Sequence, residues 1–177
     1  MRLKFMSISA VCLYLFALNQ MALASPKSRC TLPSGLGEEI STKYPGTKLV
    51  SLADLDEYKR KLFQKDHGTR CPGLARVDFY GDGKPTWALV LISGENPQRK
   101  AQLVVARQVD KKWEIRLLDT TDGTPVVWSE GAGKYDDLYG KKTIIATRPV
   151  VVFCGLESFE VVFAWTGKDV EKVQLSD

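Results

Sequence analysis

The chain has 177 residues and a nearly even charge balance, with 25 Lys and Arg against 21 Asp and Glu. A chain of this length is expected to form one compact domain with its own hydrophobic core. Proteins that bind nucleic acid usually have a large excess of Lys and Arg over Asp and Glu, which this chain does not have, so we expect no nucleic-acid partner. The bases are interleaved with acids along the chain, which is typical of a solvated surface.

The first 24 residues have the pattern of a secretory signal peptide. Arg2 and Lys4 provide a positive start, and Ile8 to Leu18 is an apolar run too short to span a membrane. Ala22-Leu23-Ala24 supplies the small residues of a cleavage site. The mature chain is therefore expected to begin near Ser25 and to work in the periplasm or outside the cell, with no membrane span after cleavage. Export also permits disulfide formation.

Three cysteines remain after cleavage, because Cys12 belongs to the signal peptide. Any two of them can pair, since sequence alone does not determine disulfide connectivity. Cys154 follows the apolar run Val150 to Phe153, where a free cysteine behaves as a small buried hydrophobe. Cys30 and Cys71 instead flank a helical region in polar, turn-rich settings. We therefore favour a Cys30–Cys71 disulfide over the two other pairings, with Cys154 as a free thiol.

Two helices are predicted in the first part of the mature chain. Ser34 is the expected N-cap of a short helix, which ends at Pro45-Gly46. A second helix is expected to begin after Ser51, where Asp54 stands three residues later as a capping box. Its acids come early and its bases late, as the helix dipole favours, and Gly68 is its natural stop.

From Cys71 onward the apolar period changes to two, which is typical of β-strands. Short turns at Asp110-Lys111 and Thr166 to Lys168 favour antiparallel hairpins. Residues 25–177 are therefore predicted to form a single α+β domain, with two N-terminal helices followed by an antiparallel β-meander. The expected strands are Leu74 to Tyr80, Thr86 to Ile92, Gln102 to Val109, Lys112 to Leu118, Thr143 to Phe153, Ser158 to Trp165 and Val170 to Leu175.

An acidic, glycine-rich segment joins the first two expected strands. Asp78-Phe79-Tyr80-Gly81-Asp82-Gly83 resembles the D-x-[DN]-x-D-G calcium loop of EF-hand-like sites and of FG-GAP/VCBS repeats, which implies calcium ligands at Asp78 and Asp82. Tyr80 and Thr86 replace two oxygen donors of that motif, and calcium needs about six to eight oxygens. We therefore favour a hairpin whose acids bond their own turn and no cofactor, with calcium as the alternative.

The same hairpin contributes to a wider resemblance. Together with Cys71-Pro72-Gly73-Leu74 and the terminal segment Glu157 to Trp165, it is similar to a group of uncharacterised small exported bacterial proteins with a single FG-GAP-like hairpin. That resemblance covers most of the mature chain and implies no activity. A propeller would need the unit repeated, and this chain has one.

A second segment resembles the Ser-Gly-x-x-Tyr loop of periplasmic C-type lysozyme inhibitors. It runs from Ser129 through Gly131 and Gly133 to Tyr135, within residues 128–139. In that family the serine and tyrosine bind the catalytic carboxylates of lysozyme, which implies binding roles for Ser129 and Tyr135 and a secreted protein as partner. Here two extra residues separate the serine from the tyrosine, and acids follow directly. A glycine-rich surface turn is the alternative.

Motifs of nucleophilic, zinc-dependent and phosphate-binding enzymes are absent from the sequence. The one histidine, His67, precedes Gly68 at a predicted helix end, where imidazoles commonly contact terminal carbonyls. The four tryptophans are expected mainly in the core, with a sugar-stacking platform as the alternative. We therefore expect an exported, non-catalytic binding protein for a secreted protein or glycan, with a lysozyme-type inhibitor or a carboxylate-dependent glycan hydrolase as alternatives. The acids available to such a hydrolase are Asp119, Asp122, Glu130, Asp136, Asp137 and Glu157.

Overall fold

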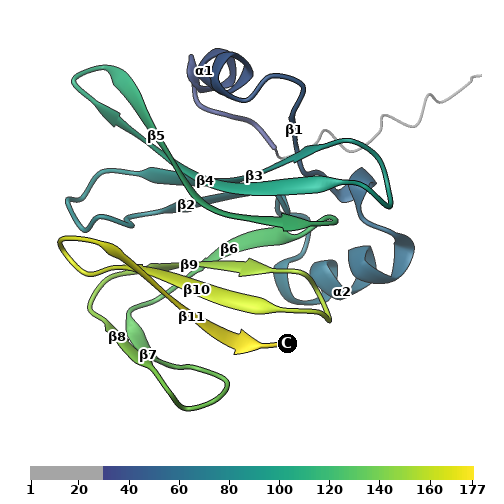
Figure 1. Cartoon of the computed structure of the whole chain (residues 1–177). Coiled ribbons are helices and arrows are strands. Elements are labelled where there is room, and N and C mark those ends of the chain that lie inside the picture. Colours follow the sequence, from purple (N-terminus) through teal and green to yellow (C-terminus); the bar gives the residue numbers. More distant parts are fainter. Residues whose placement is uncertain (1–29) are drawn as a thin grey trace, which may run out of the picture.

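The computed structural model describes residues 30–177, so the predicted signal peptide lies outside the described residues. The fold has layers, as Figure 1 shows: helix α1 lies on one sheet, that sheet faces a second one, and a small hairpin lies beyond the second sheet. Helix α2 lies at one end of the two sheets. No helix within residues 30–177 is long and apolar enough to cross a membrane.

Helix α1, Leu36–Lys43, begins one residue later than its expected cap would place it. Its N-cap is Gly35, which has a φ of 77° and makes no side-chain capping bond, so Ser34 does not cap the helix. The left-handed conformation at this point suits glycine. Leu36 and Ile40, one turn apart, are the buried residues of the helix.

Helix α2, Glu57–His67, also begins later than predicted. The capping box of Ser51 and Asp54 is present, but it encloses a short 3-10 helix, Leu52–Asp54. Leu55 then takes an extended conformation, and the Asp56 side chain caps α2 by accepting a hydrogen bond from the backbone N–H of Lys59 at 2.8 Å. Gly68 ends the helix with a φ of 63°, at the predicted position.

The first sheet contains five strands. Strands β3, β4 and β5 follow one another as antiparallel neighbours, while β1 and β2 both pair with β3 on its other side. Asp110 and Lys111 close the β4–β5 hairpin with φ values of 47° and 63°, as expected of a primed two-residue turn. The strands are β1 (Lys48–Leu49), β2 (Leu74–Val77), β3 (Thr86–Ser93), β4 (Lys100–Val109) and β5 (Lys112–Asp122).

The second sheet has the order β11-β10-β9-β6, and a separate two-stranded hairpin, β7–β8, interrupts the chain between β6 and β9. The α+β class is confirmed, but the inserted hairpin makes the strand order more complex than an uninterrupted meander. The expected strand Thr143 to Phe153 is divided in two by Thr147-Arg148-Pro149, because proline lacks the N–H that a ladder requires. The elements are β6 (Val126–Glu130), β7 (Gly133–Asp136), β8 (Thr143–Ala146), β9 (Val150–Cys154), β10 (Glu160–Trp165) and β11 (Val170–Ser176).

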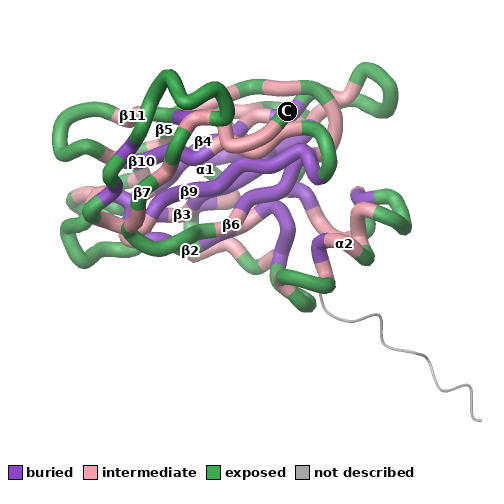
Figure 2. The backbone as a smooth tube through the Cα atoms, turned by 90° about the horizontal axis from the view of Figure 1, so that it is seen from below, coloured by how far each residue is buried: buried purple, intermediate pink, exposed green. Residues whose placement is uncertain are grey.

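The main core lies between the two sheets, where Val90 and Leu103 of the first sheet share a cluster with Phe153 and Phe163 of the second. Figure 2 shows the buried residues along the central strands and the exposed ones in the connecting turns. Helix α1 covers the outer face of the first sheet, and β8 packs on the outer face of the second. At one end, Phe63 of α2 belongs to a separate buried cluster with strands β6 and β9.

The predicted disulfide is confirmed. Cys30 and Cys71 are bonded, with 5.0 Å between their Cα atoms. Cys154 is a free, buried thiol, also as predicted. Burial raises the pKa of Cys154 to about 11, so the thiol stays protonated and unreactive at neutral pH.

Candidate functional site

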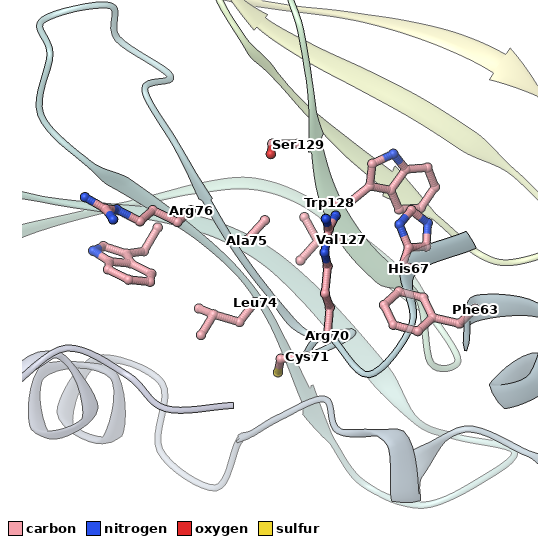
Figure 3. A pocket seen from close by; sticks show the side chains of 11 residues that line it. Phe63, His67, Arg70, Cys71, Leu74, Ala75, Arg76, Val127, Trp128 and Ser129 are labelled. Carbon is pink, nitrogen blue, oxygen red and sulfur yellow. The ribbon is translucent and has the colours of Figure 1, made fainter. Parts of the chain in front are cut away.

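A cleft of about 420 Å³ opens where β2, β6 and the C-terminal end of α2 meet (Figure 3). This volume lies within the range of small-ligand sites in proteins, about 300–1,000 Å³. Hydrophobic, aromatic and basic side chains line it. The lining residues are Phe63, His67, Arg70, Cys71, Leu74, Ala75, Arg76, Trp87, Val127, Trp128 and Ser129.

The cleft runs along the edges of two strands. Three consecutive residues of β2, 74–76, and three consecutive residues of β6, 127–129, line it. Consecutive side chains of a strand point to opposite faces, so a cavity that touches all three lies beside the backbone. Among residues 30–177, β2 pairs only with β3 and β6 pairs only with β9, which leaves one edge of each strand open. The two open edges form opposite sides of the cleft.

A hydrogen bond closes one end of the cleft. The backbone N–H of Val127 donates to the carbonyl of Pro72 at 2.8 Å, which joins the start of β6 to the residues before β2. The disulfide partner Cys71 lies next to this point and also lines the cleft. Beyond this bond, residues 74–76 of β2 and 127–129 of β6 line the cleft.

Aromatic rings form one wall of the cleft. His67 lies between Phe63 and Trp128, with ring centroids 4.8 and 4.7 Å apart and interplanar angles of 35° and 37°. The Trp128 indole is held from its other end, because its Nε1–H donates to Glu130 at 3.0 Å. On the β2 side, the Arg76 guanidinium lies 5.8 Å from the centre of the Trp87 ring, a cation–π distance. These contacts fix the rings before any ligand arrives.

The charge of the lining is positive. Arg70 and Arg76 are exposed, and within residues 30–177 neither guanidinium takes part in a salt bridge. No carboxylate of the described residues belongs to the lining. Burial lowers the pKa of His67, so its imidazole is largely neutral at pH 7 and the two arginines carry the charge.

Ser129 and Tyr135, the residues of the inhibitor-like pattern, lie on different strands. Segment 128–139 is not one loop, since it contains the end of β6 and all of β7. Ser129 lines the cleft, whereas the Tyr135 hydroxyl donates to the carbonyl of Gly131 at 2.7 Å. The Tyr135 ring packs against the buried cluster beneath the β7–β8 hairpin. Both the hydroxyl and the ring of Tyr135 therefore make contacts within the protein.

Asp78 and Asp82 hold their own turn. One Asp78 oxygen accepts the backbone N–H of Gly83 at 3.2 Å, and Asp82 accepts that of Lys84 at 3.0 Å. The other Asp78 oxygen is buried and receives no hydrogen bond from the described residues. A guanidinium also reaches this loop, because Arg148 donates to the carbonyl of Tyr80 at 2.7 Å. No group of three or more potential metal-ligating side chains occurs in the described part of the chain.

The acids named for a glycan hydrolase lie outside the cleft lining and have other partners. Three of them form surface salt bridges with lysines, and the other three accept hydrogen bonds from aromatic side chains or from the backbone. The pairs are Asp119–Lys172, Asp122–Lys100, Asp136–Lys134, Glu130–Trp128, Glu157–Tyr58 and Asp137 with the N–H of Tyr139.

A second cavity, of about 600 Å³, lies beside Trp113 on the outer face of the first sheet and shares Trp87 with the cleft. Its charged residues are of both signs, Lys84 and Lys111 against Asp110. Its net positive charge is therefore smaller than that of the β2–β6 cleft, whose lining has two arginines.

Sequence reasoning missed most of the cleft. The sequence predicts a helix-end role for His67 and a core position for most tryptophans, although all four are only partly buried. Nothing in the sequence distinguishes Arg70 and Arg76 from the other surface bases. The run Val126 to Trp128, rich in β-branched and aromatic residues, was a usable signal for strand β6.

No family model, curated protein or solved structure matches this chain. The resemblances to single FG-GAP-like hairpin proteins and to C-type lysozyme inhibitors therefore stay predictions.

Proposed function

We propose that this chain is an exported, non-catalytic binding protein that holds an anionic ligand in the β2–β6 cleft. The observation that carries this proposal is the cleft lining, which has Arg70, Arg76 and His67 but no acid. An anion entering the cleft would meet two guanidinium groups that are not committed to other carboxylates, and guanidinium groups bind carboxylates and phosphates through paired hydrogen bonds.

Two observations support export. The chain begins with a signal-like segment, and a disulfide ties Cys30 to Cys71. Disulfides persist mainly in oxidising compartments such as the periplasm and the extracellular space. We propose cleavage near Ser25, which mass spectrometry of the secreted chain would test.

The absence of catalysis is proposed because the groups beside the cleft are engaged in structural contacts. The His67 ring lies tilted between those of Phe63 and Trp128, and no hydrogen bond joins it to Ser129 in the described part of the chain. Incubation of the mature protein with peptidoglycan and with chromogenic glycosides should release no product. Turnover that disappears when one acidic residue is changed would overturn the proposal.

Binding is tested with 2-naphthoate, whose ring suits the aromatic wall and whose carboxylate suits the arginines. Its neutral isostere, 2-naphthylmethanol, serves as the control ligand. In NMR titrations, 2-naphthoate should shift the Trp128 indole signal and bind more tightly than the alcohol. Arg70→Ala and Arg76→Ala should each weaken 2-naphthoate binding by at least tenfold, because a hydrogen bond to a charged group contributes roughly 1.5–3 kcal/mol, or about 10- to 150-fold in affinity.

Arg116→Ala is the matched control variant. Arg116 is exposed on β5, outside the cleft lining, so its loss removes one positive charge without touching the site. It should leave 2-naphthoate affinity unchanged. An equal loss in Arg116→Ala, or shifts that map away from the cleft, would show that binding reflects net charge and would overturn the proposed site.

A further inference from the structure

We infer that the ligand of the cleft is an extended acidic peptide segment, which adds a strand along the open edges of β2 and β6. This inference rests on the proposed anion-binding function of the same cleft. It goes further in assigning the ligand class and in assigning a binding role to the backbone of the two strands. The ligand would be recognised through main-chain hydrogen bonds as well as through its carboxylates.

The open edge of β2 presents backbone groups to the cleft. The carbonyl of Gly73 accepts the N–H of Val90 at 2.9 Å, so Gly73 faces β3. Backbone groups of an antiparallel strand alternate in direction, so Ala75 also faces β3 and Arg76 faces away from it. The N–H and C=O of Arg76 therefore point to the open side. No turn, loop or side-chain hydrogen bond among the described residues engages them.

The open edge of β6 is placed in the same way. The N–H of Val127 points away from β9, because it donates to Pro72. By alternation, Trp128 exchanges its bonds with β9, while the N–H and C=O of Ser129 point to the open side. Ser129 lies two residues beyond the Val127–Pro72 bond that joins the two edges. Arg76 on β2 and Ser129 on β6 thus both direct backbone N–H and C=O groups into the cleft, where an added strand can pair with them.

The dimensions and charge of the cleft fit a short acidic strand. Each edge contributes three residues, which at about 3.3 Å per residue spans roughly 10 Å. Ala75 and Val127 belong to the core between the sheets and give the cleft one apolar side, whereas Leu74 and Arg76 lie on the opposite face of β2. Side chains of a bound strand alternate, so one set would meet Ala75 and Val127 and the other would meet Arg76. The preferred sequence is acidic-apolar-acidic.

The chain's own segment before Cys30 is a poor occupant. It carries Lys27 and Arg29, and like charges would oppose the arginines of the cleft. The occupant is therefore a segment of another protein, in agreement with a secreted or cell-envelope protein as the partner.

The test uses the peptide acetyl-Glu-Val-Glu-Val-Glu-amide and a copy with every backbone amide N-methylated. The copy keeps the charges but has no N–H donors. Calorimetry or NMR titration should give a loss of at least tenfold on N-methylation. A lysine counterpart, acetyl-Lys-Val-Lys-Val-Lys-amide, should not bind.

Two variants at one position test the protein backbone. Ser129→Pro removes the N–H that faces the cleft, on an edge strand where proline is tolerated. It should weaken the acidic peptide at least tenfold more than Ser129→Ala does, because alanine at the same position keeps the N–H. Melting temperatures of both variants report whether the fold is retained. The comparison with the N-methylated peptide uses the unmodified protein, so it tests the inference even if Ser129→Pro does not fold.

The outcomes separate this inference from the function on which it rests. Equal affinity for the N-methylated peptide would overturn strand addition, while 2-naphthoate binding would still support an anion cleft. If neither the peptide nor 2-naphthoate binds, both proposals fail. If an oligoglucuronate displaces 2-naphthoate at a lower concentration than the acidic peptide does, the ligand is an acidic glycan and the peptide assignment is wrong.

Discussion

At the residue scale, His67 gives the cleft a pH-dependent component. The imidazole is half-buried between Phe63 and Trp128, and burial lowers its pKa in the folded protein. In the unfolded chain the group titrates near its ordinary value of about 6.5. The unfolded state therefore binds a proton more readily than the folded one. The contribution of His67 to stability is complete above about pH 6.5 and declines as the pH falls below it.

We predict that His67→Phe will reduce the loss of stability on acidification. Phenylalanine keeps an aromatic ring between Phe63 and Trp128 but cannot bind a proton. Urea unfolding at pH 7.5 and pH 5.5 should show a smaller difference between the two conditions for His67→Phe than for the unmodified protein. An identical pH dependence in both proteins would contradict a titrating role for this residue.

At the scale of elements, the approach of β2 to the segment after β1 depends on Gly73. A Cβ atom added there would lie 2.5 Å from the carbonyl oxygen of Val50 and 2.8 Å from its nitrogen. These are backbone atoms, which cannot rotate away, so a larger residue must push the two segments apart. The close approach also places Gly73 where its carbonyl reaches Val90.

We predict that Gly73→Ala will destabilise the fold by about 1–3 kcal/mol, the usual cost of overpacking. Gly131→Ala is the matched control, because nothing lies within 4 Å of a Cβ added at that position. It should change stability by less than about 0.5 kcal/mol. Urea denaturation of both variants measures the difference. Equal stabilities would mean that β2 can shift without cost.

The turn between β2 and β3 leads to a prediction about calcium. Asp78 and Asp82 bond their own backbone, and the Arg148 guanidinium adds positive charge against this loop. Millimolar calcium should therefore leave the melting temperature unchanged, since a ligand stabilises a protein only above its dissociation constant. A rise of several degrees that is lost in Asp82→Ala would instead establish a calcium site.

The elements could be predicted from the sequence where local signals were sufficient. Gly68 ends α2 and Asp110-Lys111 closes a hairpin, because both positions depend on local backbone conformation. The Ser51–Asp54 capping box was recognised correctly, but nothing local indicated that it would enclose a 3-10 helix. Strand β7, Gly133–Asp136, has no alternating apolar pattern, so pairing with β8 determines it.

At the scale of the whole molecule, the disulfide constrains the start of the described chain. Cys30 and Cys71 are separated by 41 positions, and the chain-entropy model gives about 3–4 kcal/mol for closing such a loop. We predict that the double variant Cys30→Ser, Cys71→Ser will lose about this much stability in urea unfolding. A reducing agent should produce a similar loss in the unmodified protein and none in the variant. Unchanged stability in both experiments would contradict this role.

The candidate site depends on the global fold more than any element does. Arg70 and Arg76 are near one another in sequence, but Trp128 and Ser129 follow more than fifty positions later. In the described part of the chain, β2 pairs with β3 and β6 pairs with β9, and the two open edges lie side by side as a result. Sequence reasoning identified Ser129 through a local pattern, yet its neighbours in the cleft come from tertiary packing.

Because Cys71 belongs both to the disulfide and to the lining of the cleft, the way the protein is produced bears on every ligand screen. Material made in the bacterial cytosol would carry free thiols at Cys30 and Cys71, and the segment before Pro72 would lose its covalent tether. Such a preparation could fold and still present an altered cleft lining at Cys71. A thiol count with Ellman's reagent under denaturing conditions, giving one thiol per mature chain, should therefore precede any binding assay.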